Sequence, residues 1–391
     1  MVDYDLLIPY GWTESVAKEY LPYLDPGFTP ARIVRMDRGE CDVVTPDGPA
    51  RATCPRADSE VSGLCTGDWV VLDARSHVRT LLPRRSALAR SSASGRSERQ
   101  VLAANVDTVL ICTAADGDVD LARIERMLAL VWEGGAQPVV VLTKADAAED
   151  VPLDEVRAVA PGAAVLAVSA DTGAGLDVLT AVLDGTVALL GPSGAGKSTL
   201  ANALLGAEVF ATNQVRGTDK KGRHTTVHRE LRPLPGGGTL IDTPGLRGVG
   251  VWDAAEGIGR TFSDIEELAG ACRFDDCAHD REPGCAVREA VDSGILTPRR
   301  LHSYRKLARE NAWLQARTDK RLQAERDEAW RSITKQQRRM YRERGKPLTP
   351  DNRTRLLRAA ATETLPVAAG PSPAGACKTG FENYEDADLR R

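Results

Sequence analysis

The feature that most constrains the fold is the order of two motifs along the chain. The stretch GPSGAGKST (191–199) has the pattern G-x-x-x-x-G-K-[ST], and it lies between the apolar run TVALL and the helical pattern TLANALLG. In this context the pattern predicts a loop whose backbone N–H groups bind phosphates at a helix N-terminus. The tetrapeptide TKAD (143–146) has the form of a guanine-reading motif, but it precedes the phosphate loop instead of following it. This order predicts a GTPase sheet whose chain has been circularly permuted.

The surrounding sequence alternates between predicted strands and predicted helices, as in an α/β layer. Near-continuous apolar runs occur at 107–114, 138–146, 163–170 and 186–191, with helical patterns such as LARIERMLALVWEGG between them. Strands buried on both faces and separated by helices indicate a parallel sheet. Residues 228–245 predict an antiparallel hairpin with PGGG at its turn.

The residues of the phosphate loop have separate expected roles. Gly191, Gly194 and Gly196 let backbone N–H groups converge on the phosphates. Lys197 is expected to span the β- and γ-phosphates, and Ser198 to ligate Mg²⁺.

The TKAD motif is expected to select the base. The Asp146 carboxylate can accept two hydrogen bonds from guanine, whereas adenine offers neither donor there. The stem of Lys144 would lie along the base, and the backbone N–H of Ala170 would approach the guanine oxygen. Both motifs end predicted strands, where open α/β sheets bind ligands. The predicted nucleotide-binding residues are Thr143, Lys144, Ala145, Asp146, Ser169, Ala170, Gly191, Pro192, Ser193, Gly194, Ala195, Gly196, Lys197, Ser198, Thr199 and Gly245.

Two further segments are expected to act on the γ-phosphate and Mg²⁺. In DTPG (242–245), Asp242 would hold the Mg²⁺ shell and the Gly245 N–H would sense the γ-phosphate. Leu246 follows where many GTPases place a water-orienting Gln, so intrinsic hydrolysis should be slow. Within KKGRHTT (220–226), Thr225 or Thr226 could add a hydroxyl to Mg²⁺. His224 is a candidate for positioning water, with an ordinary loop contact as the alternative. The expected catalytic residues are Lys197, Ser198, His224, Thr225, Thr226 and Asp242.

A cysteine and histidine cluster predicts one structural zinc site. Cys272, Cys277, His279 and Cys285 supply three thiolates and one imidazole within fourteen residues. Four protein ligands fill a tetrahedral Zn²⁺ shell and leave no position for substrate. Four further cysteines lie in predicted strands and are expected to pack in the core: Cys41, Cys54, Cys65 and Cys112.

The N-terminal part predicts a small β-domain. Residues 13–21 could form a short helix with Thr13 as N-cap, and about five short strands follow between Ala31 and Asp73. An OB-type barrel fits this pattern, although a small sandwich or an SH3-like barrel fits nearly as well. The Ser/Arg-rich stretch 83–99 is expected to be a linker, and phosphate contact is its alternative role.

The charge is unevenly distributed. Residues 299–358 contain 19 Lys and Arg against 7 Asp and Glu, in a chain whose net charge is −4. This segment predicts one or two basic helices, with Leu301, Tyr304, Ala308 and Ala312 on one face. RNA backbone contact is favoured over a merely solvated face. The Pro/Ala/Gly-rich sequence from 346 to 391 is expected to be disordered.

The N-terminal sequence MVDYDLLIPYGW lacks the basic start and apolar run of a secretory signal. No run approaches the roughly 18 apolar residues of a membrane span. We therefore expect a cytoplasmic protein with no membrane partner, and a monomer.

Taken together, the motifs resemble the RsgA family of circularly permuted GTPases that depend on the small ribosomal subunit. The resemblance covers about residues 30–320 and depends on GDWV (67–70), QVLAANVD (100–107), TKAD, GPSGAGKSTL, GRHTT (222–226), DTPGLR (242–247) and C-x4-C-x-H-x5-C. The chain departs from the family at Thr143, where Asn is usual, so it lacks the amide donor that braces the base-reading loop.

The resemblance implies a domain order and a function. It implies an N-terminal segment and OB-fold (1–85), a permuted P-loop GTPase domain (86–255), and a zinc-binding and basic helical domain (256–345), followed by the tail (346–391). It implies GTP and GDP as ligands and late maturation of the small (30S) ribosomal subunit, with slow hydrolysis that the subunit and its rRNA accelerate. The alternative is a nucleotide-gated rRNA-binding module in which hydrolysis is incidental.

Overall fold

The computed structural model describes residues 3–25, 27–55, 63–91, 99–210, 229–241 and 254–316, and the single residues 320 and 324. The chain divides into two compact units, 1–321 and 322–391. Among its described residues, no helix is long and apolar enough to cross a bilayer.

The chain begins with short helices that cover one end of a β-barrel. They are η1 (Asp5–Tyr10), α1 (Glu14–Tyr20) and η2 (Leu21–Tyr23). The Thr13 hydroxyl accepts a hydrogen bond from the Val16 N–H, which confirms the predicted N-cap. Leu7 and Tyr20 pack in a cluster with Trp69 of the barrel. The helices thus bury an apolar face that the barrel would otherwise expose.

The five strands of the barrel confirm the OB-type prediction. They are β1 (Phe28–Met36), β2 (Glu40–Thr45), β3 (Gly48–Thr53), β4 (Trp69–Asp73) and β5 (Val78–Leu81). The sheet order is β3-β2-β1-β4-β5, and every neighbouring pair is antiparallel. A parallel bridge between Thr53 and His77 joins the two edges and closes the barrel. This strand order with a parallel closure distinguishes the OB topology from the sandwich and SH3-like alternatives.

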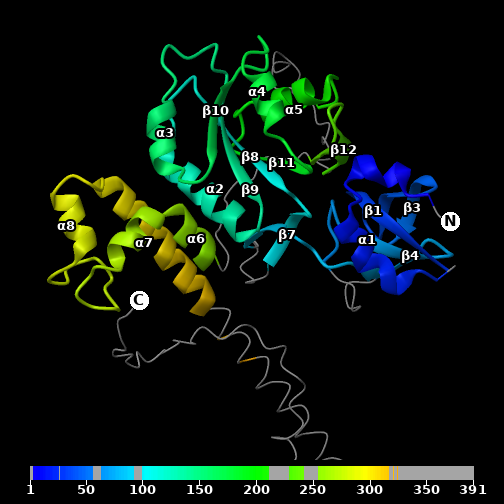
Figure 1. Cartoon of the computed structure of the whole chain (residues 1–391), viewed down its shortest axis with the longest axis horizontal. Helices are drawn as coiled ribbons and strands as arrows, with labels where there is room; N and C mark the ends of the chain where they lie inside the picture. The colour runs from blue at the N-terminus through cyan, green and yellow to red at the C-terminus, as the bar shows by residue number, and fades with distance from the viewer. Residues whose placement is uncertain are drawn as a thin grey trace, which may run out of the picture. The chain divides into compact units, whose positions relative to one another are not determined.

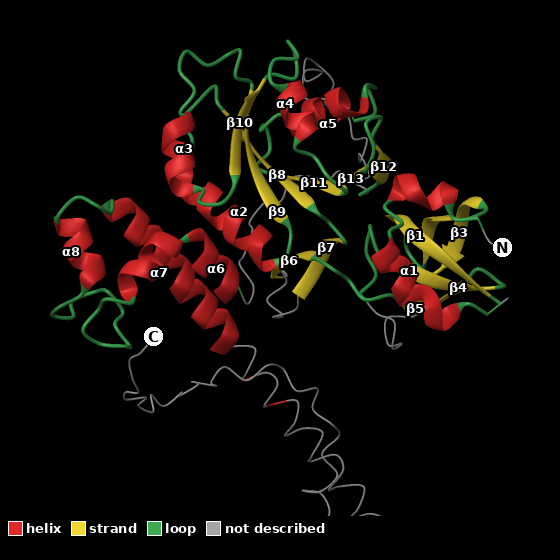
Figure 2. Ribbon diagram, viewed as in Figure 1, coloured by secondary structure: helices red, strands yellow, loops and turns green. Residues whose placement is uncertain are grey.

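The expected linker at 83–99 is partly wrong. Residues Ala87–Ser91 form β6, which pairs antiparallel with β7 (Arg99–Ala104). The apolar residues Leu88 and Leu102 are buried in the main core, which explains why this Ser/Arg-rich stretch contains a strand. Figure 2 shows this hairpin below the central sheet.

The central sheet has six strands in the order β10-β9-β8-β11-β13-β12. The strands are β8 (Thr108–Ala114), β9 (Gln137–Thr143), β10 (Ala164–Val168), β11 (Thr186–Leu190), β12 (Leu231–Pro233) and β13 (Thr239–Ile241). The first five strands in this order are parallel, and β12 pairs antiparallel with β13 as the predicted hairpin. The parallel sheet and the hairpin are therefore confirmed.

Helices cover both faces of this sheet (Figure 1). They are α2 (Leu121–Glu133), α3 (Leu153–Val159), α4 (Leu176–Ala181) and α5 (Lys197–Leu205). One core cluster joins α2 and α3 to side chains such as Ile111 of β8, and the other joins α4 and α5 to side chains such as Leu110. Alternate residues of one strand thus face opposite layers, as burial on both faces requires.

A buried arginine joins the barrel to the sheet. The Arg32 guanidinium donates to Thr186 Oγ1 at 2.8 Å and to the Tyr10 carbonyl, and the residue is 1% exposed. Burial lowers the pKa of Arg32 to about 9, with Asp107 opposing the shift. Thr186 begins β11, which leads into the phosphate loop, so the barrel is attached close to the nucleotide domain's core.

The C-terminal part of this unit is helical. It contains α6 (Ala255–Thr261), α7 (Ser263–Ala269), α8 (Ala286–Asp292) and a helix over 298–316. The helix 298–316 buries Leu301, Leu307 and Leu314 and exposes Ala312, so the predicted face was wrong at that residue. The face follows the larger leucines because they bury more apolar surface than alanines.

The joint between this region and the central domain is tight and charged. A Cβ on Gly257 would lie 2.0 Å from the Ala129 carbonyl oxygen, so α6 lies directly against α2. Glu125 of α2 is fully buried and accepts hydrogen bonds from Arg299 and Arg300 at 2.9–3.0 Å. Arg300 also forms a bidentate pair with Asp264 at 2.6 and 2.7 Å.

Candidate nucleotide and metal sites

The phosphate loop has the backbone that its glycines predict. Gly191, Gly194 and Gly196 all have positive φ, at 152°, 87° and 68°. A Cβ on Gly191 would lie 2.3 Å from the Cys112 carbonyl oxygen, so no other residue fits there without displacing β8. Gly196 is the N-cap of α5, which begins at Lys197. The loop therefore presents the first turn of a nine-residue helix, with its free N–H groups, to any bound phosphate.

Lys197 is folded onto this loop. Its Nζ donates to the carbonyl oxygens of Gly191 and Pro192 at 2.9 and 2.7 Å, and the residue is 9% exposed. The ammonium thus lies inside the loop that a phosphate would fill. Ser198 and Thr199 follow in the first turn of α5 and are partly exposed. The structure brings these residues together as the sequence predicts.

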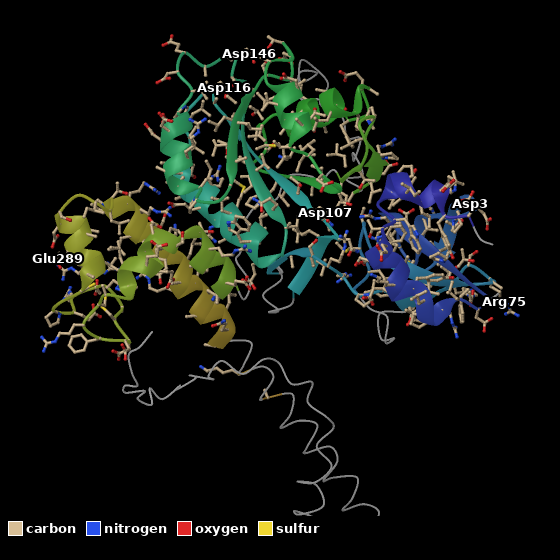
Figure 3. All side chains as sticks on the ribbon, viewed as in Figure 1. Asp3, Arg75, Asp107, Asp116, Asp146 and Glu289 are labelled. Carbon is tan, nitrogen blue, oxygen red and sulfur yellow. The ribbon has the colours of Figure 1, made fainter. Side chains whose placement is uncertain are left out.

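The base-reading loop follows β9 at the same edge of the sheet. Lys144 has φ 55°, and its Nζ lies 2.8 Å from Asp116 Oδ2. The Ala145 N–H donates to the Val168 carbonyl at 3.3 Å, which ties the loop to the end of β10 and so to Ser169 and Ala170. Figure 3 shows Asp116 and Asp146 on loops at this end of the domain, and Asp146 is exposed.

Thr143 connects the base-reading loop to the phosphate loop. Its Oγ1 lies 3.0 Å from the Ala195 carbonyl oxygen and 3.3 Å from that of Thr113, and the residue is 4% exposed. A hydroxyl has one proton to donate, so the shorter contact to Ala195 is the main bond. The two motifs that lie 48 residues apart in sequence are therefore hydrogen-bonded to each other.

Ser169 holds the second base-contacting loop in shape. Its Oγ accepts a hydrogen bond from the Thr172 N–H at 3.1 Å, and its backbone N–H donates to the Ala174 carbonyl at 2.9 Å. Ser169 is 1% exposed, whereas Ala170 is partly exposed and available at the edge of the site.

Several expected site residues lie outside the residues that the structure describes. They are His224, Thr225, Thr226, Asp242 and Gly245, and Leu246 lies outside as well. Their roles stay predictions.

Sequence reasoning missed Asp116. It lies two residues beyond the end of β8, at the edge where ligands bind in open α/β sheets. That position is the signal that could have identified it. The sequence does not show that Asp116 pairs with Lys144, because no motif links these two residues.

The four predicted zinc ligands come together. The ligand atoms of Cys272, Cys277, His279 and Cys285 all lie within 4.8 Å of one another. The sulfur atoms of Cys272 and Cys285 are 3.8 Å apart, and the His279 Nδ1 lies 3.6 and 3.5 Å from them. A tetrahedron with Zn–S near 2.3 Å and Zn–N near 2.05 Å has edges of about 3.8 and 3.6 Å. The geometry therefore fits one Zn²⁺ bound through Nδ1.

The surroundings favour the ligand forms of two of these residues. Burial lowers the pKa of His279, and the charge of Arg305 adds to this effect, so the imidazole is neutral. Burial opposes ionisation of Cys272, but hydrogen bonds from the N–H groups of Val287 and Ala286 and from the side chains of Cys285 and Cys277 together lower its pKa. Neutral imidazole and thiolate are the forms that bind metal.

The remaining cysteines among the described residues belong to the core. Cys41, Cys65 and Cys112 are buried, and Cys54 is partly buried against the barrel core. Burial raises the pKa of Cys112 to about 12, so its thiol stays neutral beneath the phosphate loop.

Comparison with known proteins agrees with this geometry. The family model described as RsgA GTPase matches residues 81–252. A protein of Streptomyces avermitilis named small ribosomal subunit biogenesis GTPase RsgA is 55% identical over 338 residues, which cover 83% of this chain and 91% of the relative. The chain belongs to the RsgA family. A relative of the same name from Opitutus terrae is 42% identical and is covered over 98% of its length.

Solved structures support the fold. The crystal structure of YjeQ from Thermotoga maritima matches with a TM-score of 0.53 and 24% identity, covering 72% of this chain and 97% of that one. A structure described as YloQ, a circularly permuted GTPase, matches with a TM-score of 0.51 and 23% identity, covering 76% and 98%. The permuted fold predicted from the motif order is confirmed.

Proposed function

We propose that this chain hydrolyses GTP and acts in the biogenesis of the small ribosomal subunit. The observation that carries the proposal is the hydrogen bond from Thr143 to the Ala195 carbonyl, which makes the base-reading and phosphate loops a single site. Membership of a GTPase family and the printed names of its relatives support the same activity.

The base is selected at one end of this site. Asp146 accepts the two guanine N–H donors, and adenine provides neither of them. Lys144, held by Asp116, covers one face of the base. Thr143 and Ala145 fix the loop, and Ser169 shapes the neighbouring loop so that the Ala170 N–H meets the guanine oxygen.

The phosphates are held at the other end. The backbone N–H groups of residues 191–199 surround the β-phosphate, and Lys197 exchanges its two carbonyl contacts for β- and γ-oxygens. Ser198 and Asp242 would hold Mg²⁺, with Thr225 or Thr226 as a further ligand. When bound, Mg²⁺ neutralises charge that develops on the phosphates. Lys197 and the Gly245 N–H stabilise the same charge while water attacks in line.

The chain has no strong hydrogen-bonding group at the position that orients the attacking water in many GTPases. Leu246 has no hydrogen-bonding group, and His224 is the candidate that acts in its place. Intrinsic hydrolysis is therefore slow, and the small subunit with its rRNA completes the site and accelerates it. Hydrolysis then times release from the subunit. We further propose a cytoplasmic monomer with domains at 1–85, 86–255 and 256–345, a tail at 346–391, and one structural Zn²⁺ on Cys272, Cys277, His279 and Cys285.

The test is phosphate release from GTP and ATP, with and without purified small subunits. Strong stimulation with GTP alone supports the proposal, and equal use of ATP or no stimulation contradicts it. The alternative, an rRNA-binding module with incidental hydrolysis, predicts that a folded Lys197→Ala variant leaves subunits as readily as the parent.

A further inference from the structure

We propose that a cavity at the edge of the central sheet opposite the nucleotide loops binds a small sugar phosphate, with Arg260 and Arg85 contacting the phosphate group. We call it the Arg260 cavity. It has a volume of about 390 Å³. Small-molecule sites commonly have volumes of about 300–1,000 Å³, so this cavity has the size of a ligand site. Its lining includes Arg85, Ser86, Asp107, Trp132, Gln137 and Arg260.

The Arg260 cavity lies where the parallel strands begin. Asp107 directly precedes β8 and Gln137 begins β9, whereas Asp116 and the TKAD motif are found where the same two strands end. Each strand has seven residues and is therefore about 20 Å long. Figure 3 shows Asp107 at the opposite end of the sheet from Asp116 and Asp146. A ligand in this cavity therefore does not occupy the nucleotide site, and the inference goes beyond the proposed function.

The lining of the cavity carries a net positive charge. The Arg260 guanidinium carbon lies 4.4 Å from the centroid of the Trp132 ring, and in the described part of the chain no carboxylate pairs with it. Arg85 Nη2 lies 3.3 Å from Asp107 Oδ1, and Asp107 Oδ2 accepts a hydrogen bond from the Thr186 N–H at 2.7 Å. Both oxygens of the single aspartate are thus engaged, and the charge of Arg260 is left for an anion.

The indole of Trp132 has an unused donor. The residue is 8% exposed, and its Nε1 is buried without a hydrogen-bond partner among the residues that the structure describes. Buried polar groups are nearly always paired, so this wall of the cavity lacks an acceptor. A phosphate oxygen beside the ring supplies that acceptor when the Arg260 guanidinium turns toward the same ligand.

The remaining lining suits hydroxyl groups. Gln137 donates through Nε2 to the Gly162 carbonyl at 3.2 Å, which leaves its Oε1 to accept. Ser86 Oγ uses its proton on the Val106 carbonyl, so its oxygen can also accept. Inorganic phosphate would fill a small part of the cavity and leave both acceptors unused, and a nucleic-acid strand is too large for it. A phosphate ester of a small sugar matches the arginines and the acceptors together.

The experiment is a calorimetric titration of the full chain with ribose 5-phosphate. The nucleotide site is first filled with Mg²⁺ and a non-hydrolysable GTP analogue, so that the probe cannot bind there. We expect one saturable site per chain. Ribose, inorganic phosphate and malate, titrated in parallel, should each bind at least about 10-fold more weakly, because each lacks one part of the recognised chemistry.

Variants of the lining test the assigned contacts. Arg260→Gln should weaken binding of ribose 5-phosphate about 10-fold, because it removes a charge-assisted hydrogen bond. Trp132→Phe should weaken it about fivefold, because it removes the indole N–H. Arg288→Gln on α8, an exposed arginine outside the cavity, is the charge-matched control and should leave the affinity unchanged. Melting curves and binding of the GTP analogue verify that each variant is folded.

The indole N–H of Trp132 gives a second readout. Its signal in a ¹H–¹⁵N spectrum, identified by its absence from Trp132→Phe, should shift when ribose 5-phosphate binds. An unchanged signal overturns the proposal, as does a Kd above about 10 mM or equal affinity for inorganic phosphate or malate. Absence of GTP hydrolysis would instead contradict the proposed function, so the two failures are distinguishable.

Discussion

Removing the Thr143 hydroxyl should weaken nucleotide binding without touching the nucleotide. Thr143→Val keeps the shape of a side chain that is 4% exposed and deletes the donor to the Ala195 carbonyl. A typical intramolecular hydrogen bond contributes about 1 kcal/mol net, with a range of about 0.5–1.5. If that energy holds the phosphate loop closed, its loss makes the binding-competent loop less populated, and the apparent affinity falls in proportion.

The expected effect is a rise in Kd of up to about fivefold, because 1 kcal/mol divided by RT gives a factor near five and the full factor applies where the closed loop is the minor state of the free protein. The rise should be similar for GDP and GTP, since the bond supports the loop and not the γ-phosphate. Titration with a fluorescent guanine nucleotide measures it. Thr180→Val is the matched control, because its hydroxyl bonds to the Leu176 carbonyl within α4 and is exposed. A Thr143→Val protein that binds GDP within a factor of 1.5 of the parent would refute the idea that this hydrogen bond holds the phosphate loop closed.

Three further outcomes follow from the described contacts. Asp116→Asn should raise the Kd for GDP about two- to threefold at low salt and less at high salt, because the ion pair between Asp116 and Lys144 is partly exposed. The control Asp118→Asn, on the same loop and titrated in parallel, should leave the Kd unchanged. Glu125→Gln should lower the free energy of unfolding by about 3 kcal/mol in denaturant titrations, because it breaks the buried ion pairs with Arg299 and Arg300. The same change at the partly exposed Glu310 should lower it by less than about 1 kcal/mol. A chelator should lower the melting temperature. Zinc content measured after dialysis should fall only at a pH below the ordinary histidine value of about 6.5, because burial lowers the pKa of His279 and keeps its imidazole neutral until the pH falls further. An unchanged melting temperature with the chelator would contradict a structural metal.

The motifs predicted the architecture well because each has a local physical cause. The glycines at 191, 194 and 196 specify a backbone that residues with a side chain rarely adopt, and the structure has that backbone. The spacing of four metal ligands within fourteen residues is likewise a local property. The order of TKAD before the phosphate loop needed only the rule that both lie at the carboxyl ends of parallel strands.

The errors concern residues whose partners are distant in sequence. The strand at Ala87–Ser91 lies in a Ser/Arg-rich stretch and forms because Leu88 enters a core built mainly from later residues. Asp116 became part of the base site through Lys144, and Arg300 became a core residue through Glu125 and Asp264. Composition identified Arg300 only as one of many basic residues. Tertiary contacts of this kind leave no periodic or spacing signal in the sequence.

The helix α2 lies between the predicted guanine site and the helical region. Asp116, which holds Lys144, lies four residues before Asp120, the N-cap of α2. On the same helix, Glu125 binds Arg299 and Arg300, and Glu133 accepts a bond from the Gly257 N–H at 3.0 Å. The 13-residue helix α2 therefore carries the contacts to the helical region and begins next to the loop that contains Asp116. A partner that binds the helix 298–316 therefore acts on a helix that is bonded to Glu125 and Arg126 of α2. Weakening the Glu125 cluster should reduce the stimulation of hydrolysis by subunits more than it reduces the intrinsic rate, and equal losses in both would show that α2 provides stability alone.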